Sequence, residues 1–193
     1  IEDDFESDFY FDGPPPLPLA ADALNDRVVY VGTFNNILFP ALRVAFLVAP
    51  KSQIDAFLAA PEAAMRASST STQIVLHAFM DQGHLAAHIR NCREVFADRR
   101  SILIENLAAE LGSRWTVHVP KMGLLVQAWL PADGDDLALK ETARNHGVIV
   151  SAMRGHAQLP TRPGLFLGFA AHSNAAIRKA VRGLARAADI IPR

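Results

Sequence analysis

The chain has 193 residues, of which 50% are hydrophobic and 20% are charged, a composition typical of a globular protein with one or two cores. Its formal net charge of −1 argues against a general nucleic-acid-binding surface, although it leaves room for a local basic patch. The single cysteine, Cys92, excludes an intramolecular disulfide and fits a reducing cytosol. No apolar run reaches the ~20 residues that span a bilayer, and no signal peptide is visible, so we expect a cytoplasmic protein without membrane partners.

The first part of the chain alternates short apolar runs with helical patterns. Two of these runs are rich in β-branched residues, which favours strands of a sheet covered on both faces. The chain is predicted to begin with a strand end at residues 1–5 and a proline-rich, non-helical connection at 11–24. Buried strands are expected next at 27–32 and 43–49. Three helices should follow: one at 52–58, one that starts at Pro61, and one at 71–81 that stops at Gly83.

Residues 84–111 have apolar positions at near-helical spacing over about seven turns, which predicts one long helix that Gly112 ends. Helices of this length commonly connect two lobes. The elements expected after it are strands at 115–119 and 124–130, a helix at 135–146, strands at 148–150 and 165–169, and an amphipathic helix capped by Ser173. This order predicts a small α+β lobe in which a sheet packs against helices.

Three segments carry a resemblance to a known family. Residues 32–43 (GTFNNILFPALR) closely resemble the G-T-F-S-K-T-L-F-P-x-L-R segment of the MocR-type regulators, which belong to the GntR family of transcription factors. Residues 1–9 (IEDDFESDF) are similar to that family's I-E-D-D-Y-D-S-E-F, and residues 88–100 (HIRNCREVFADRR) to its H-x-R-R-M-R-x-x-Y-x-x-R-R signature. The three segments occur in the family's order and together span nearly the whole chain.

The C-terminal part of a MocR-type regulator copies a fold-type I aminotransferase, a transferase that depends on pyridoxal phosphate. The resemblance therefore implies an α/β fold, in which residues 1–95 complete a large three-layer α/β/α domain and residues 96–193 form a small C-terminal α+β domain. It also implies that a DNA-binding winged helix and the first half of the large domain belong upstream of this chain.

The family's covalent cofactor anchor is missing. In the family, the lysine of the GTFSK segment holds pyridoxal phosphate as a Schiff base, and this position is Asn36 here. An amide nitrogen has delocalised its lone pair into the carbonyl and cannot attack an aldehyde as an amine does. We therefore assign no catalytic residue and expect pyridoxal phosphate to bind noncovalently at most.

Other positions of the cofactor site are retained or altered. The resemblance places Asp3 against the pyridine nitrogen, although the adjacent Asp4 leaves the register open, and it places Thr33 and Arg43 at the phosphate, with Asn35 beside them. Phe5 replaces a tyrosine whose hydroxyl contacts the cofactor ring. The alternatives are that Asp3 is a surface acid and that Arg43 pairs with a carboxylate.

Two further features have more ordinary interpretations. Phe166 stands where aminotransferases often carry the arginine that binds the substrate carboxylate, and we interpret it as a core aromatic residue. His84 and His88 have the i, i+4 spacing of some zinc sites but lack the accompanying glutamate, so no metal site is predicted. The arginines of residues 90–100 and the cations of the last helix are predicted to be solvated surface charges.

The first hypothesis is an aminotransferase-like regulatory domain that senses a small-molecule effector, a B6 vitamer or an amino acid, and forms a homodimer. It would contact DNA only through the upstream domain. The rival is a working pyridoxal-phosphate aminotransferase that uses an unorthodox amine such as Lys121, or a lysine of a partner chain. A third hypothesis is a dimerisation module without a ligand.

Overall fold

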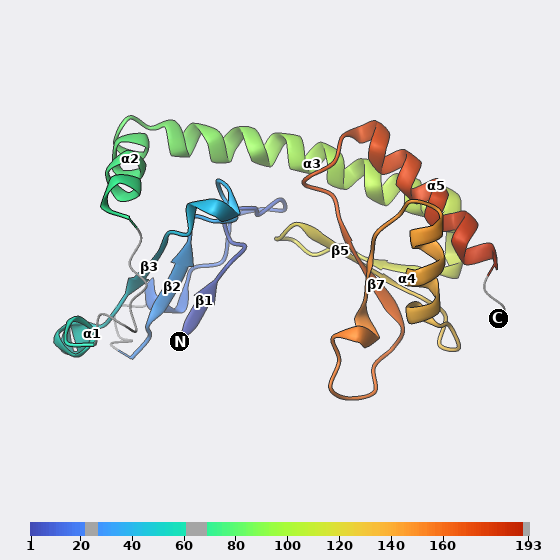
Figure 1. The fold of residues 1–193 in the computed structure, drawn as a ribbon, viewed down its shortest axis with the longest axis horizontal. Coiled ribbons are helices and arrows are strands. Elements are labelled where there is room, and N and C mark those ends of the chain that lie inside the picture. Colours follow the sequence, from blue (N-terminus) through green and yellow to red (C-terminus); the bar gives the residue numbers. More distant parts are fainter. Residues whose placement is uncertain (22–26, 61–68, 191–193) are drawn as a thin grey trace. The chain divides into compact units, whose positions relative to one another are not determined.

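The structure is a computed structural model that describes residues 1–21, 27–60 and 69–190 (Figure 1). The chain divides into two compact units, Ile1–Asn91 and Cys92–Arg193. Among the described residues, no helix is both long enough and apolar enough to cross a bilayer.

The first unit contains a three-stranded sheet of β1 (Glu2–Asp4), β2 (Tyr30–Thr33) and β3 (Ala45–Val48), in that order. β1 is parallel to β2, whereas β2 and β3 are antiparallel. Gly32 in β2 lies under the ring of Phe46 in β3, where a Cβ atom would come within 2.3 Å of Phe46 Cζ. Because only glycine leaves this space, the ring packs directly on the strand.

The helices of this unit confirm two of the predicted segments. α1 (Ile54–Leu58) follows the 3-10 turn η3 (Lys51–Gln53), and α2 (Thr70–Asp81) ends before Gly83, whose φ is +75°. The helix start expected at Pro61 lies outside the described residues.

Two expectations for this unit were wrong. The proline-rich connection contains a 3-10 turn, η1 (Leu19–Ala21), because the N–H of Ala21 donates to the carbonyl of Pro18 at 2.9 Å. β3 was expected to be buried, yet all four of its residues are exposed within the described part of the chain. Apolar, β-branched composition predicted a strand correctly but could not say which neighbours cover it.

α3 (His84–Leu111) is a single 28-residue helix, as its periodicity predicted. In the second unit its buried residues Leu103, Leu107 and Leu111 belong to the core. The positive φ of Gly112, +58°, ends the helix, and the 3-10 turn η4 (Gly112–Arg114) follows.

The second unit builds a four-stranded antiparallel sheet in the order β4-β5-β7-β6. Its strands are β4 (Thr116–His118), β5 (Leu125–Trp129), β6 (Ser151–Ala152) and β7 (Gly164–Gly168). The helices are α4 (Asp136–Asn145), the 3-10 turn η5 (Met153–Gly155) and α5 (Asn174–Ile190). The predicted α+β lobe is confirmed.

The last helix has the predicted amphipathic pattern. Ser173 accepts a hydrogen bond on its Oγ from the N–H of Ala176 at 3.3 Å, as an N-cap does. Ile177, Val181 and Leu184 are buried on one side of α5, which packs against α4 (Figure 1).

The strand expected at residues 148–150 was wrong. Val148 and Val150 are buried and Ile149 is 85% exposed, so the side chains alternate as in a strand. Pairing with β7 nevertheless starts only at Ser151, opposite Phe166. The apolar, β-branched run was visible in the sequence, whereas the partner strand depends on the tertiary fold.

Candidate functional site

The candidate site lies where β1 and β2 end. These strands are parallel, with Asp4 opposite Gly32, so the residues that follow them meet at the same edge of the sheet. This carboxyl edge is the usual place for ligands in parallel sheets. It brings Phe5, after β1, close to the Thr33–Asn36 segment at the end of β2.

Asn36 has a defined partner at this edge. Its side-chain Nδ2 donates a hydrogen bond to the backbone carbonyl of Phe5 at 2.9 Å. The next residue is also held, because His88 Nε2 on α3 donates to the carbonyl of Ile37 at 2.8 Å. The carboxamide thus joins the segments after β1 and β2, and His88 holds the backbone of the following residue.

The loop between β2 and β3 is closed by its own polar groups. Asn35 Oδ1 accepts from the N–H of Val44 at 3.3 Å, and Thr33 Oγ1 accepts from the N–H of Asn35 at 3.2 Å. The Thr33 hydroxyl also donates to the carbonyl of Val44 at 3.4 Å. Thr33 and Asn35, both predicted as cofactor residues, therefore also shape the loop.

Arg43 occupies an unusual backbone conformation beside this loop. Its φ of +53° makes it the only described residue other than glycine with a positive φ. For a side chain with a Cβ, the left-handed region costs roughly 1–2 kcal/mol. Residues held in such conformations are concentrated at functional sites, and the Arg43 side chain is exposed.

Asp3 and Asp4 point to opposite faces of β1, because side chains alternate along a strand. Asp4 is engaged: Ser7 donates to it through its N–H at 3.0 Å and its hydroxyl at 2.5 Å, and the Tyr30 hydroxyl donates at 2.5 Å. Asp3 is exposed and has no side-chain hydrogen bond to any residue in the described ranges. Of the two acids, Asp3 is therefore the one available to a ligand.

The contact between Asp4 and Tyr30 shifts the pKa of both side chains. Burial alone would raise the pKa of Asp4, but the hydrogen bonds from Ser7 and Tyr30 outweigh it and lower the pKa below 3.8. Burial, together with the adjacent Asp4 carboxylate, raises the pKa of Tyr30 from 10.0 to about 12. Nothing in the sequence points to this Tyr30–Asp4–Ser7 cluster, because Tyr30 has only the pattern of a strand residue.

The remaining predicted positions are distributed over both units. Phe5 is 56% exposed in the first unit. Phe166 lies on β7 of the second unit, where its ring meets that of His156 edge-on at 6.2 Å. Lys121 is exposed in the turn between β4 and β5 of the second unit. Among the described residues, no three His, Cys, Asp or Glu side chains form a group that could hold a metal ion.

Two exposed side chains beside this edge have the chemistry that a cofactor of the pyridoxal-phosphate type requires. Asp3 and Arg43 offer a carboxylate and a guanidinium at exposed positions, which suit a protonated ring nitrogen and a phosphate. Asn36 offers an amide that is already donating to Phe5. No amine stands at this position.

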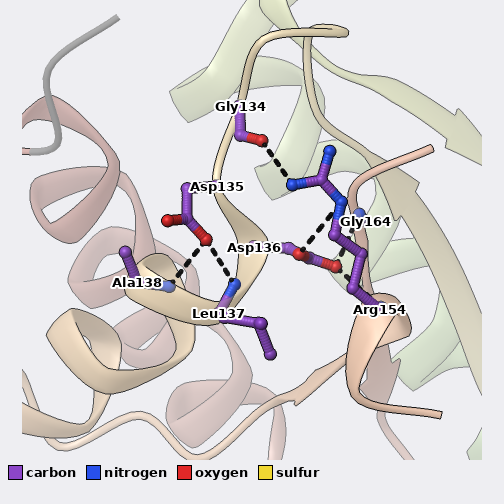
Figure 2. A network of polar contacts seen from close by, with 7 residues as sticks. All are labelled: Gly134, Asp135, Asp136, Leu137, Ala138, Arg154 and Gly164. Carbon is purple, nitrogen blue, oxygen red and sulfur yellow. Dashed lines mark hydrogen bonds and ion pairs between the residues drawn. The ribbon is translucent and has the colours of Figure 1, made fainter. Parts of the chain in front are cut away.

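A second polar network, in the second unit, surrounds a buried acid (Figure 2). Asp136 is 0% exposed, and its Oδ2 accepts from the backbone N–H groups of Arg154 at 3.0 Å and Gly164 at 3.1 Å. Its Oδ1 lies 3.8 Å from Arg154 Nε, and the Arg154 guanidinium also donates to the carbonyl of Gly134. The network fixes the start of α4 to η5 and β7, so we assign it a structural role.

Comparison with curated proteins gives relatives of two kinds, although no family model matches the chain. The chain is 28% identical over 185 residues to the probable rhizopine catabolism regulatory protein MocR of Rhizobium meliloti, covering 95% of this chain and 38% of that protein. It is 29% identical over 187 residues to the HTH-type transcriptional regulator YdeL of Bacillus subtilis, covering 95% and 40%. It is 29% identical over 150 residues to aromatic-amino-acid aminotransferase 1 of Thermococcus litoralis, covering 77% and 36%.

Several solved structures with a similar fold are aminotransferases. The α-aminoadipate aminotransferase LysN of Thermus thermophilus matches with a TM-score of 0.87 and 25% identity, over 97% of this chain and 49% of that chain. A kynurenine aminotransferase of Pyrococcus horikoshii matches with a TM-score of 0.88 and 23% identity, over 99% and 48%. The chain thus spans about two fifths of the curated regulators and about half of the solved structures that it matches.

Proposed function

We propose that this chain is the aminotransferase-like regulatory domain of a MocR-type transcription factor of the GntR family. Two observations support the proposal: the sequence similarity to such regulators and the fold-type I aminotransferase fold. In this proposal the domain senses a small-molecule effector, a B6 vitamer or an amino acid, and supports a homodimer in the cytoplasm. A separate upstream domain would bind the operator DNA.

Asn36 is the observation that carries the proposal. A transaminase of this fold needs a primary amine at the cofactor aldehyde, and this position holds a carboxamide that donates to the Phe5 carbonyl at 2.9 Å. The tyrosine that would contact the cofactor ring is also replaced, by Phe5. Losing the anchor while keeping Asp3, Thr33 and Arg43 favours recognition over turnover.

Pyridoxal phosphate, when bound, supplies an electron sink for amino-acid chemistry. In a noncovalent complex, Asp3 would hold the protonated ring nitrogen, and Arg43 would bind the phosphate with its planar fork of donors. Thr33, the last residue of β2, would add its hydroxyl, which would have to exchange its 3.4 Å hydrogen bond to the carbonyl of Val44 for one to the phosphate. The resemblance to the family assigns these roles, and the exposure of Asp3 and Arg43 supports them.

The test is a comparison of Asn36→Lys with the wild type and with Asn36→Gln, which keeps an amide, in the complete protein. After incubation with pyridoxal phosphate and borohydride, we expect mass spectrometry to find a reduced adduct on Asn36→Lys only. Calorimetry should show saturable noncovalent binding of the vitamer to the wild type. A borohydride-trapped adduct on any wild-type lysine at this site contradicts the proposal.

A working aminotransferase is the alternative, and the similarity to the Thermococcus litoralis enzyme favours it. A turnover assay with amino-acid and keto-acid pairs separates the two functions. Turnover by the wild type that is lost in Arg43→Ala would establish the enzyme. Absence of both turnover and vitamer binding would instead support a purely structural dimerisation module.

A further inference from the structure

One face of α5 carries four positively charged side chains. Arg178, Lys179, Arg182 and Arg186 are all exposed, and we call these four residues the basic face of α5. At 3.6 residues per turn they fall within a sector of about 100°, and the three arginines follow one another about every 6 Å along the helix. The opposite side of the helix holds the buried residues Ile177, Val181 and Leu184.

This face differs from an ordinary solvated helix surface, on which charges of both signs alternate and pair. None of its four side chains forms a hydrogen bond or ion pair with another described residue. The only acidic residue of α5, Asp189, is already paired with Arg114 at 2.9 Å. The four positive charges are therefore left without a counter-charge in the described part of the chain.

The net charge of −1 conceals a separation of charge between the two units. Residues 92–193 contain 14 lysines and arginines against 9 aspartates and glutamates, whereas residues 1–91 contain 5 against 11. The basic face thus belongs to a basic unit, in which the long-range field favours the approach of a polyanion.

We propose that the basic face of α5 binds the phosphate backbone of duplex DNA, as a second, sequence-independent DNA contact of the regulator. The inference rests on the proposed function, because a transcription factor holds this unit at high local concentration near DNA. Arginine matches phosphate oxygens with two parallel donors, and each neutralised phosphate releases counterions, which strengthens binding. A face made only of Arg and Lys offers phosphate contacts and no pattern for reading bases.

The experiment uses the complete protein and a fluorescein-labelled duplex of random sequence, with the dissociation constant measured by anisotropy over a series of salt concentrations. The variant Arg178→Gln/Arg182→Gln removes two charges from the basic face. The matched control, Lys51→Gln/Arg144→Gln, removes two exposed charges elsewhere that have no side-chain partner among the described residues. Glutamine is a good helix former, so thermal melts should show that both variants fold.

We expect the variant to bind DNA more weakly than the wild type. In a plot of the logarithm of the association constant against the logarithm of the salt concentration, its slope should be less steep by about 1.8, which is about 0.9 for each phosphate that is no longer neutralised. The single change Arg186→Gln should reduce the slope by about 0.9, and the control should retain the wild-type slope. Equal slopes for wild type, variant and control overturn the inference while leaving the proposed function intact. A complete wild-type protein that binds no DNA at low salt overturns both.

Discussion

The Tyr30 hydroxyl donates a hydrogen bond of 2.5 Å to the Asp4 carboxylate and so links side chains of the first two strands. Because both groups titrate, this contact makes the stability of the first unit depend on pH. Tyr30→Phe removes the donor while keeping the ring, which lies 6.0 Å from that of Phe46. We expect the free energy of unfolding at neutral pH to fall by about 1 kcal/mol, the usual net contribution of a hydrogen bond. Chemical denaturation of the two proteins measures the difference.

The pH dependence of this difference follows from the raised pKa of Tyr30. Its folded-state pKa of about 12 lies above the ordinary value of 10.0, so the contribution is complete below pH 10.0 and is lost as the pH rises through about 12. The stability difference between wild type and Tyr30→Phe should therefore shrink over this window. A stability difference that stays constant as the pH rises from 10.0 through about 12 would contradict this assignment.

The acid side of the same contact behaves in the opposite sense. Because hydrogen bonds lower the pKa of Asp4 below 3.8, the contribution of its carboxylate is present above pH 3.8 and is lost as the pH falls through the lowered value. We expect Asp4→Asn to be less stable than the wild type at neutral pH and to converge with it in acid. Convergence that begins near neutral pH would contradict the assignment.

At the scale of elements, the two adjacent aspartates at the start of α4, Asp135 and Asp136, have different structural roles. Asp135 is the exposed N-cap, whose carboxylate accepts from the N–H groups of Leu137 and Ala138 at 3.1 Å each. Asp136 is fully buried and accepts from backbone N–H groups of two other elements (Figure 2). The first acid stabilises one helix, whereas the second joins three elements.

Replacing each aspartate by alanine should separate these roles. Asp135→Ala should cost about 1 kcal/mol of unfolding free energy, the typical effect of losing a helix cap. Asp136→Ala should cost more, about 2–4 kcal/mol, because it leaves the backbone N–H groups of Arg154 and Gly164 without their acceptor. Urea denaturation of both variants measures the two costs, and equal costs would contradict the structural role of Asp136.

The same two aspartates show which features of the fold could be predicted from the sequence and which could not. The helix start at residue 135 was predictable, because capping and periodicity are local patterns. The burial of Asp136 was not, because it depends on Arg154 and Gly164, which are brought there by the tertiary fold. The wrong strand prediction at residues 148–150 has the same cause, since an apolar, β-branched run is a local pattern and the choice of partner strand is not.

In the candidate site, too, the residues could be predicted from the sequence, whereas their contacts could not. Thr33, Asn35, Asn36 and Arg43 stand in one continuous motif, so a resemblance could assign them together. The contacts of that motif with Phe5 and His88 come from segments 31 and 51 residues away along the chain, measured from Asn36 and Ile37. The carboxamide of Asn36 is visible in the sequence, whereas its hydrogen-bond partner, the carbonyl of Phe5, is not.

At the scale of the whole molecule, the exposed apolar residues of the first unit are the main feature. Leu47 and Val48 on β3 are 44% and 53% exposed, and Ile74 and Val75 on α2 are 63% and 69% exposed. The solved aminotransferases with this fold are about twice as long as the part that the chain matches. We infer that these faces meet other parts of a longer protein or a second copy.

We therefore expect this chain, when purified alone, to form dimers or larger assemblies, because exposed apolar faces promote association. The double change Val48→Lys/Val75→Lys places charges on both faces at exposed positions, where the cost to folding is small. Sedimentation should show less assembly for this variant than for the wild type. A control, Leu159→Lys, changes an apolar residue that is 80% exposed in the second unit and should leave the assembly unchanged. A monodisperse wild-type monomer at micromolar concentration would contradict the prediction, since these faces would then be stable in water on their own.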